Sequence, residues 1–132
     1  MAAPTKAGKE PIWIVLDSSC WIEYLRDTPR ADLFATAAEN PERLLVPIIT
    51  IYEVTKKLRR ELSPKVAAYA EALMCRGKVV DVDTALSRIA ICHPLPMADS
   101  LIYATAQAHG AKLWTQDAHF QDLPGVKFFA KD

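Results

Sequence analysis

The sequence predicts an α/β fold, a three-layer sandwich in which helices cover both faces of a mainly parallel sheet. Two observations lead to this prediction. Five short apolar segments alternate with segments of helical periodicity, which is the pattern of strands joined by helical crossovers. The first segment, Ile12 to Leu16, is apolar at every position, as in a strand that is buried on both faces. Such a strand lies in the middle of a sheet with helices on each side.

The first half of the chain is expected to contain three helices and a second strand. In order, these are a helix over residues 20–26, a helix that opens at Thr28-Pro29 and ends at Asn40-Pro41, a strand over residues 44–46, and a helix that begins at Thr50. Ser18 or Ser19 can cap the first helix. The expected core positions of the other two helices are Leu33, Phe34, Ala37, Ile51, Val54, Leu58 and Leu62.

The second half of the chain repeats the alternation of helices and strands. We expect a helix that begins at Ser63-Pro64 and ends near Gly77, a strand over 79–82, a helix capped by Thr84, a helix over 97–109 that ends at Gly110, and strands over 112–115 and 126–129. In the first of these helices, the residues expected to face inward are Val66, Tyr69, Ala70 and Leu73.

The length of 132 residues and the hydrophobic content of 51% suit one domain with its own core. We expect this domain to span residues 12–132 and to follow a flexible arm, residues 1–11, which carries no apolar signal segment. No stretch approaches the roughly 18 apolar residues that suggest a membrane span. We therefore expect a cytoplasmic protein that makes no contact with membranes.

The charged residues balance, with sixteen basic and sixteen acidic side chains. This balance argues against nucleic-acid binding through net charge, although a local basic face or a metal ion could still serve that purpose. The basic residues Lys56, Lys57, Arg59 and Arg60 follow one another closely within one expected helix. They form either a solvated face or a surface that contacts phosphates, and the sequence leaves both interpretations open.

The cysteines and histidines show no metal-ligand spacing. The cysteines, Cys20, Cys75 and Cys92, form no C-x-x-C pair, and we expect reduced, mostly buried thiols. The histidines, His93, His109 and His119, are expected to be exposed or to cap helices.

Four acidic residues follow the expected strands closely. Asp17 and Asp117 lie directly after strands, whereas Glu53 and Asp99 lie in the first turns of helices. The carboxyl ends of parallel strands and the amino ends of the helices that follow them share one edge of a sheet, so all four acids could meet there. Clustered carboxylates repel one another unless a cation neutralises them, and oxygen ligands suit Mg²⁺ or Mn²⁺. An ion held in this way would favour hydrolysis of a phosphodiester.

Each acid also has a purely structural explanation. Glu53 stands three residues after Thr50, as in a capping box. Asp99 could complement a helix dipole, Asp117 could be a turn residue, and Asp17 could simply end a strand. All four explanations would have to hold at one edge of the same sheet.

The motifs around these acids are LDSS at Asp17, IYEV at Glu53, MADSLIYATA at Asp99 and LWTQDAHF at Asp117, with a closing LPGVKFF. In this order and spacing they resemble the PIN-domain family, above all the VapC-type toxins of prokaryotic toxin–antitoxin pairs. The resemblance extends from Ile12 to about Phe129.

The resemblance implies a five-stranded parallel sheet in the order 3-2-1-4-5 and ribonuclease activity that depends on Mg²⁺ or Mn²⁺. It also implies a homodimer and a cognate antitoxin that blocks the active site. The four positions that match the catalytic and metal-binding acids of the family are Asp17, Glu53, Asp99 and Asp117. Ser18 and Thr115 match positions that support these acids through hydrogen bonds.

The functional hypothesis is therefore a metal-dependent endoribonuclease, the toxin of a type II toxin–antitoxin system. Two alternatives stay open at this point. One is another Mg²⁺-dependent phosphotransfer domain, although Asp17-Ser18-Ser19 lacks the paired acids or the D-x-D that such domains carry after their first strand. The other is a non-catalytic α/β binding module, in which the acids serve as caps and turns and no Mn²⁺ binds.

Overall fold

The computed structural model describes residues 12–131. The expected arm, residues 1–11, lies outside the described residues. The division of the chain into an arm and one domain over residues 12–132 therefore stays a prediction.

The described residues form five short strands and six α-helices, and two α-helices follow each of the first three strands. The strands are β1 (Ile14–Leu16), β2 (Leu45–Pro47), β3 (Lys78–Val80), β4 (Lys112–Thr115) and β5 (Val126–Phe128). The helices are α1 (Ser18–Leu25), α2 (Ala31–Ala38), α3 (Ile48–Glu61), α4 (Pro64–Met74), α5 (Thr84–Ala90) and α6 (Met97–Ala108), with 3-10 turns η2 (Pro41–Arg43) and η3 (Ala118–Phe120). The predicted α/β class is confirmed, and the strands lie within one to two residues of their expected positions.

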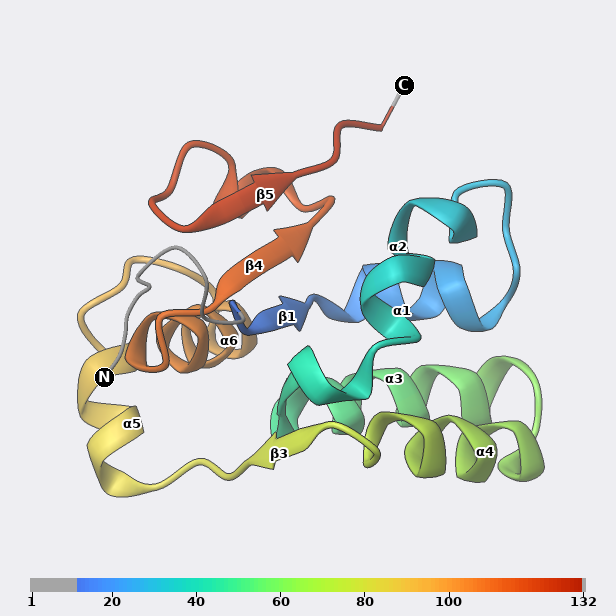
Figure 1. The fold of residues 1–132 in the computed structure, drawn as a ribbon. Helices are drawn as coiled ribbons and strands as arrows, with labels where there is room; N and C mark the ends of the chain where they lie inside the picture. Colours follow the sequence, from blue (N-terminus) through green and yellow to red (C-terminus); the bar gives the residue numbers. More distant parts are fainter. Residues whose placement is uncertain (1–11, 132) are drawn as a thin grey trace, which may run out of the picture.

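All strand pairs in the described residues are parallel. One group has the order β1-β4-β5 (Figure 1), and the other pairs β2 with β3. A single parallel bridge between Ile14 and Leu44 connects the two groups. The pairings within each group agree with the predicted order 3-2-1-4-5, and the junction between β2 and β1 consists of this bridge alone.

Helices cover both faces of β1, as the unbroken apolar character of the strand predicts. Ile14 and Leu16 belong to one core cluster, which also contains buried residues of α1, α2, α3 and α4. Val15, which points the opposite way, belongs to a second cluster with buried residues of α6 and β4. Figure 1 shows α1 to α4 on one side of β1 and α6 on the other. The predicted three-layer sandwich is thus confirmed.

Several predicted helix starts are wrong by a few residues. The cap of α1 is Asp17, not Ser18 or Ser19, and the cap of α5 is Asp83, not Thr84. In both cases neighbouring residues can all act as caps, and only the backbone conformation selects one of them. Helix α2 begins at Ala31 rather than beside Pro29: the Thr28 hydroxyl donates to Glu23 and accepts from the Arg30 N–H at 3.2 Å, so Thr28 closes a turn before the helix.

Some residues expected inside the core lie at the surface. Leu33, Leu62 and Tyr69 are exposed, whereas α4 buries Ala67, Ala70 and Met74. The expected stripe that contains Tyr69 and the buried stripe that contains Ala67 both have helical spacing on α4. The small side chains of the buried stripe form the face that packs closely against α3.

Of the cysteines, Cys20 alone is buried, so the expectation of mostly buried thiols is wrong for Cys75 and Cys92. All three are free.

Among residues 12–131, no helix combines the length and the apolar character that a bilayer span requires.

Gly77, expected to end a helix, instead allows a close approach between β3 and its neighbour β2. A Cβ atom at this position would lie 2.9 Å from Leu44 Cβ and 2.9 Å from Val46 Cγ2. Both neighbours are almost fully buried, so neither can move aside freely.

We therefore expect Gly77→Ala to lower the free energy of unfolding by about 1–3 kcal/mol through overpacking. Urea denaturation followed by circular dichroism measures this. Arg76→Ala, at the exposed neighbouring position, is the control and should change stability by no more than about 0.5 kcal/mol. Equal stability of Gly77→Ala and the wild-type protein would contradict the close packing.

Candidate active site

Asp17 is held in place from two sides at the carboxyl end of β1. Its backbone N–H continues the ladder to the Trp114 carbonyl at 3.0 Å. Its Oδ1 accepts from the Ser18 N–H at 2.7 Å, which caps α1, and its Oδ2 accepts from the Thr115 hydroxyl at 2.7 Å. Asp17 is 5% exposed, so the carboxyl group is both buried and fixed in orientation.

Burial raises the pKa of Asp17 from 3.8 to about 6. The hydrogen bonds from Thr115 and Ser18 act in the opposite direction, and the nearby carboxylates of Asp99 and Asp117 raise the pKa further. Without a cation, the folded protein therefore holds a proton on Asp17 more strongly than the unfolded chain does. A positive charge in the same cavity would reverse this preference.

Thr115 links two acidic positions. While its hydroxyl donates to Asp17, its Oγ1 accepts from the Asp117 N–H at 2.9 Å. Asp117 then caps the short turn η3, because its Oδ1 accepts from the His119 N–H at 2.9 Å. The end of β4 thus orients both its own acid and the acid at the end of β1.

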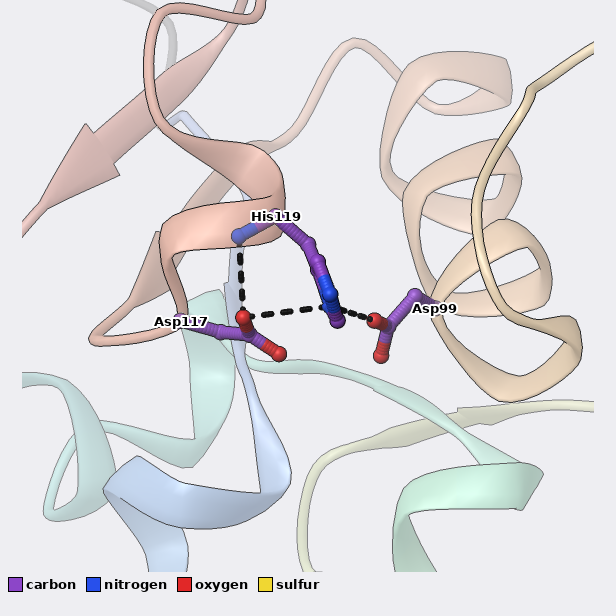
Figure 2. Close-up of side chains that lie close together, drawn as sticks. All are labelled: Asp99, Asp117 and His119. Atoms are coloured by element: carbon purple, nitrogen blue, oxygen red, sulfur yellow. Dashed lines mark hydrogen bonds and ion pairs between the residues drawn. The ribbon is translucent and has the colours of Figure 1, made fainter.

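Asp99, Asp117 and His119 form a compact group, and Figure 2 shows the His119 ring between the two carboxylates. His119 Nδ1 lies 3.0 Å from Asp99 Oδ2 and 3.3 Å from Asp117 Oδ1. The hydrogen bond to Asp99, and then the charge of Asp117, raise the pKa of His119. Burial is the main cause that raises the pKa of Asp99, and the His119 contact opposes it.

The structure places Glu53 on α3 in contact with α1. The Ser18 hydroxyl donates a short hydrogen bond to Glu53 Oε1. The capping-box alternative for Glu53 is wrong, because α3 begins at Ile48 and the Thr50 hydroxyl donates to the Pro47 carbonyl at 2.6 Å. Glu53 is therefore held by a contact between two helices rather than by its own helix end.

All four predicted acids line one cavity of about 440 Å³. The cavity also contacts Ser18, Ser19, Gln116, Ala118 and Lys131. Asp17, Glu53, Asp99 and Asp117 come from four different elements, and the parallel arrangement of the strands brings them together as the sequence predicts.

Sequence reasoning missed His119, which was expected to be an exposed or capping residue. It is exposed, with 58% of its side chain accessible, yet its ring nitrogen contacts two of the predicted acids. The available signal was its position two residues after Asp117, where a short turn can bring a side chain back to the preceding acid. Its contact with Asp99, twenty residues away, has no local signal.

The donor atoms of this site suit a hard divalent cation. One ligand atom from each of Asp99, Asp117 and His119 lies within 4.8 Å of the others, and the buried Asp17 carboxyl lies at the same cavity. Several carboxylates at one cavity repel one another, and the charges of Asp99 and Asp117 add to the effect of burial in raising the pKa of Asp17. A divalent cation would relieve this repulsion, so the residues fit the ion that the sequence implies.

The chain belongs to the PIN domain family, because the PIN domain model matches residues 14–126. Comparison with curated proteins finds no match.

Solved structures with a similar fold include a toxin–antitoxin complex from Klebsiella pneumoniae, with a TM-score of 0.75 and 19% identity over 89% of this chain and 99% of that chain. The DNA-bound VapBC from Salmonella typhimurium has a TM-score of 0.68 and 20% identity over 90% of this chain and 98% of that chain. The sarcin-ricin loop cleaving toxin of Mycobacterium tuberculosis has a TM-score of 0.70 and 17% identity over 86% of this chain and 96% of that chain. At these identities the likeness establishes a shared fold.

The raised pKa of Asp17 predicts how the stability of the metal-free protein depends on pH. Below pH 3.8 the carboxyl is protonated in both the folded and the unfolded state and contributes nothing. Between pH 3.8 and about 6 the unfolded state loses the proton first, so stability falls as the pH rises. We expect Asp17→Asn to remove this loss, so that the stability of the variant stays level from pH 4 to pH 7 while that of the wild-type protein falls by about 2–3 kcal/mol.

Urea denaturation in EDTA at several pH values measures the effect. The Asp32→Asn variant, altered at an exposed position of α2, is the control and should follow the wild-type curve. An Asp17→Asn variant whose stability runs parallel to that of the wild-type protein from pH 4 to pH 7 would contradict the prediction.

Proposed function

We propose that the protein is a metal-dependent endoribonuclease that hydrolyses RNA phosphodiester bonds and is the toxin of a type II toxin–antitoxin pair. The observation that carries the proposal is the meeting of four carboxylates, from four elements of a PIN fold, at one cavity. The structural neighbours support the toxin part, since two of them are toxin–antitoxin assemblies and a third is a toxin that cleaves an RNA loop. A cytoplasmic location stays part of the proposal.

In this proposal Asp17, Asp99 and Asp117 hold Mg²⁺ or Mn²⁺, and Glu53 completes the site and orients the attacking water. The bound ion would lower the pKa of that water and stabilise the charge that develops on the phosphate oxygens. Two residues act by orientation. Thr115 directs the Asp17 carboxylate toward the cavity, and Ser18 directs Glu53 toward it.

The first test of the proposal is metal dependence. Cleavage of single-stranded RNA should stop in EDTA and return when Mg²⁺ or Mn²⁺ is added in excess.

Glu53→Gln should keep the fold, because the amide oxygen can still accept from Ser18, but should cut about a hundredfold more slowly. Its melting temperature in EDTA should equal or exceed that of the wild-type protein, since one negative charge has left the cluster.

Calorimetric titration with Mn²⁺ provides a readout besides activity, and the wild-type protein should bind the ion. Glu42→Gln, at an exposed position of η2, is the matched control and should cut at the wild-type rate. Undiminished cleavage in chelator would rule out the metal mechanism. A Glu53→Gln variant that cuts normally would remove Glu53 from the site.

We also propose that the protein is a homodimer and that a cognate antitoxin covers the acidic cavity. Large apolar side chains are exposed from the residue before the cap of α5 to the first residue of α6. They are Val82, Ile89, Ile91 and Met97, and Ile91 and Met97 are 77% and 75% exposed. A second copy of the chain would remove this apolar surface from water.

Light scattering at micromolar concentration should therefore give the mass of a dimer. Ile91→Glu should produce a monomer with an unchanged circular dichroism spectrum, because a charge would be buried in the contact. Leu62→Glu, an equivalent change at an exposed apolar residue of another surface, should leave the dimer intact. A monomeric wild-type protein would contradict the prediction.

A further inference from the structure

A second, larger hollow of about 620 Å³ adjoins the acidic cavity between α1 and α3. The two share a wall formed by Ser18, Ser19, Glu53, Gln116 and Lys131. Glu53 marks the boundary, since it faces both spaces. A ligand held in the second hollow would therefore lie directly beside the proposed catalytic centre.

The second hollow is basic, in contrast to its neighbour. Lys56, Lys57 and Arg60 of α3 line it, together with Lys131. Glu61 partly neutralises two of these residues, because it lies 2.8 Å from Lys57 Nζ and 3.6 Å from an Arg60 nitrogen. Lys56 has no carboxylate partner within residues 12–131, and it contributes a full positive charge to the hollow.

An exposed aromatic ring lies beside this charge. Tyr52, one turn before Lys56 on α3, is 55% exposed and lines the same hollow. Lys56 Nζ lies 3.0 Å from the Tyr52 hydroxyl and 5.2 Å from the ring centroid. Proteins that bind single-stranded nucleic acids combine cations for the backbone with aromatic rings on which bases stack.

Two buried polar atoms on the shared wall form no hydrogen bond of regular geometry in the described part of the chain, although the hydrogen bond from Thr28 and then the nearby Gln116 side chain lower the pKa of the Glu23 carboxylate. They are Gln116 Nε2 and Ser19 Oγ. Gln116 is 6% exposed, and Arg30 Nε donates to its Oε1, which identifies the remaining end of the side chain as the N–H donor. Leaving a buried donor unsatisfied is costly, so these atoms indicate a ligand that supplies acceptors.

Arg30 also fixes a second part of the shared wall. Its guanidinium donates to the Phe129 carbonyl at 3.4 Å and to the Ala130 carbonyl at 3.2 Å. These contacts hold the segment that carries Lys131 to both hollows. Arg30 thus orients both the Gln116 amide donor and the Lys131 cation toward the wall that the two hollows share.

We propose that this hollow binds the stretch of single-stranded RNA next to the scissile phosphate, on one side of the cut. Gln116 Nε2 donates to a backbone oxygen of the adjacent nucleotide, Tyr52 stacks on a base, and Lys56 neutralises the following phosphate. Gln116 acts as a positioning residue rather than a catalytic one. The inference rests on the ribonuclease activity proposed above and assigns the direction in which the substrate leaves the acidic cavity.

Fluorescence anisotropy with a short labelled single-stranded RNA tests the hollow, in an Asp117→Asn background that prevents cleavage. Lys56→Gln should weaken binding and reduce the slope of log K against log salt by about 0.7, as one lost phosphate contact predicts for a single strand. Tyr52→Leu should weaken binding about fivefold or more, the effect of losing one stacked base.

Each variant has a matched control on a surface outside the hollow. Lys65→Gln removes an exposed lysine of α4, and Tyr69→Leu removes an exposed tyrosine of the same helix. Both should bind RNA like the parent protein. If Lys65→Gln changes the salt slope as much as Lys56→Gln does, the cations act as a general surface charge, and the proposed hollow is wrong.

Steady-state cleavage in excess Mn²⁺ tests Gln116 in the otherwise wild-type chain. Gln116→Met keeps the length of the side chain and removes the donor together with the oxygen that accepts from Arg30, so KM should rise about tenfold while kcat stays within about threefold. Because the Arg30 contact is lost as well, the melting temperature should fall by several degrees, and a raised KM at nearly unchanged kcat is what distinguishes the positioning role from a structural one. A fall in kcat and melting temperature with KM unchanged would overturn the positioning role.

The outcomes also separate this inference from the function on which it rests. A wild-type protein that neither binds nor cuts RNA in Mn²⁺ would overturn both. If the wild-type protein cuts RNA but Lys56→Gln, Tyr52→Leu and Gln116→Met all match it, the subsite alone is wrong. Loss of antitoxin binding in these variants, with unchanged RNA binding, would assign the hollow to the protein partner and overturn the RNA proposal.

Discussion

The site depends on the parallel pairing of β1 with β4. This pairing sets Leu16 beside Trp114, so the residues that follow each strand emerge at the same edge. The contact between Asp17 and Thr115 then extends the pairing by one side-chain hydrogen bond. Because Thr115 also accepts from the Asp117 backbone N–H, a shift in register would separate the two acids and break the hydrogen bond between Thr115 and Asp17. The geometry of the carboxylates is therefore a property of the sheet rather than of the loops.

The sequence was sufficient for features that depend on local pattern. The unbroken apolar run before Asp17 identified a strand buried on both faces, and short strands alternating with helices identified the parallel sheet. The four acids could be placed because a strand end and the following helix start always share an edge in such a sheet. Positions such as Glu53 could be located in this way, whereas their hydrogen-bond partners could not.

The failures of sequence reasoning concern choices that only tertiary packing makes. On α4, stripes that contain either Tyr69 or Ala67 have helical spacing, and the need for close packing against α3 decided between them. The contact of His119 with Asp99 joins segments twenty residues apart, and no local pattern encodes it. The neutral total charge likewise hid a separation of charge, because acids gather in one hollow and cations of α3 gather in the next.

The buried thiol of Cys20 can report on the pairing of β1 with β4. Its thiol lies fully buried under the start of α1 and contacts the Trp114 carbonyl at 3.4 Å, and burial raises its pKa far above the ordinary range of a thiol. Thiol reagents react with the thiolate, so Cys75 and Cys92, which are exposed, are modified in the native protein while Cys20 is protected. The rate at which Cys20 reacts therefore measures how often β1 opens against β4, and the measurement needs no substrate or metal.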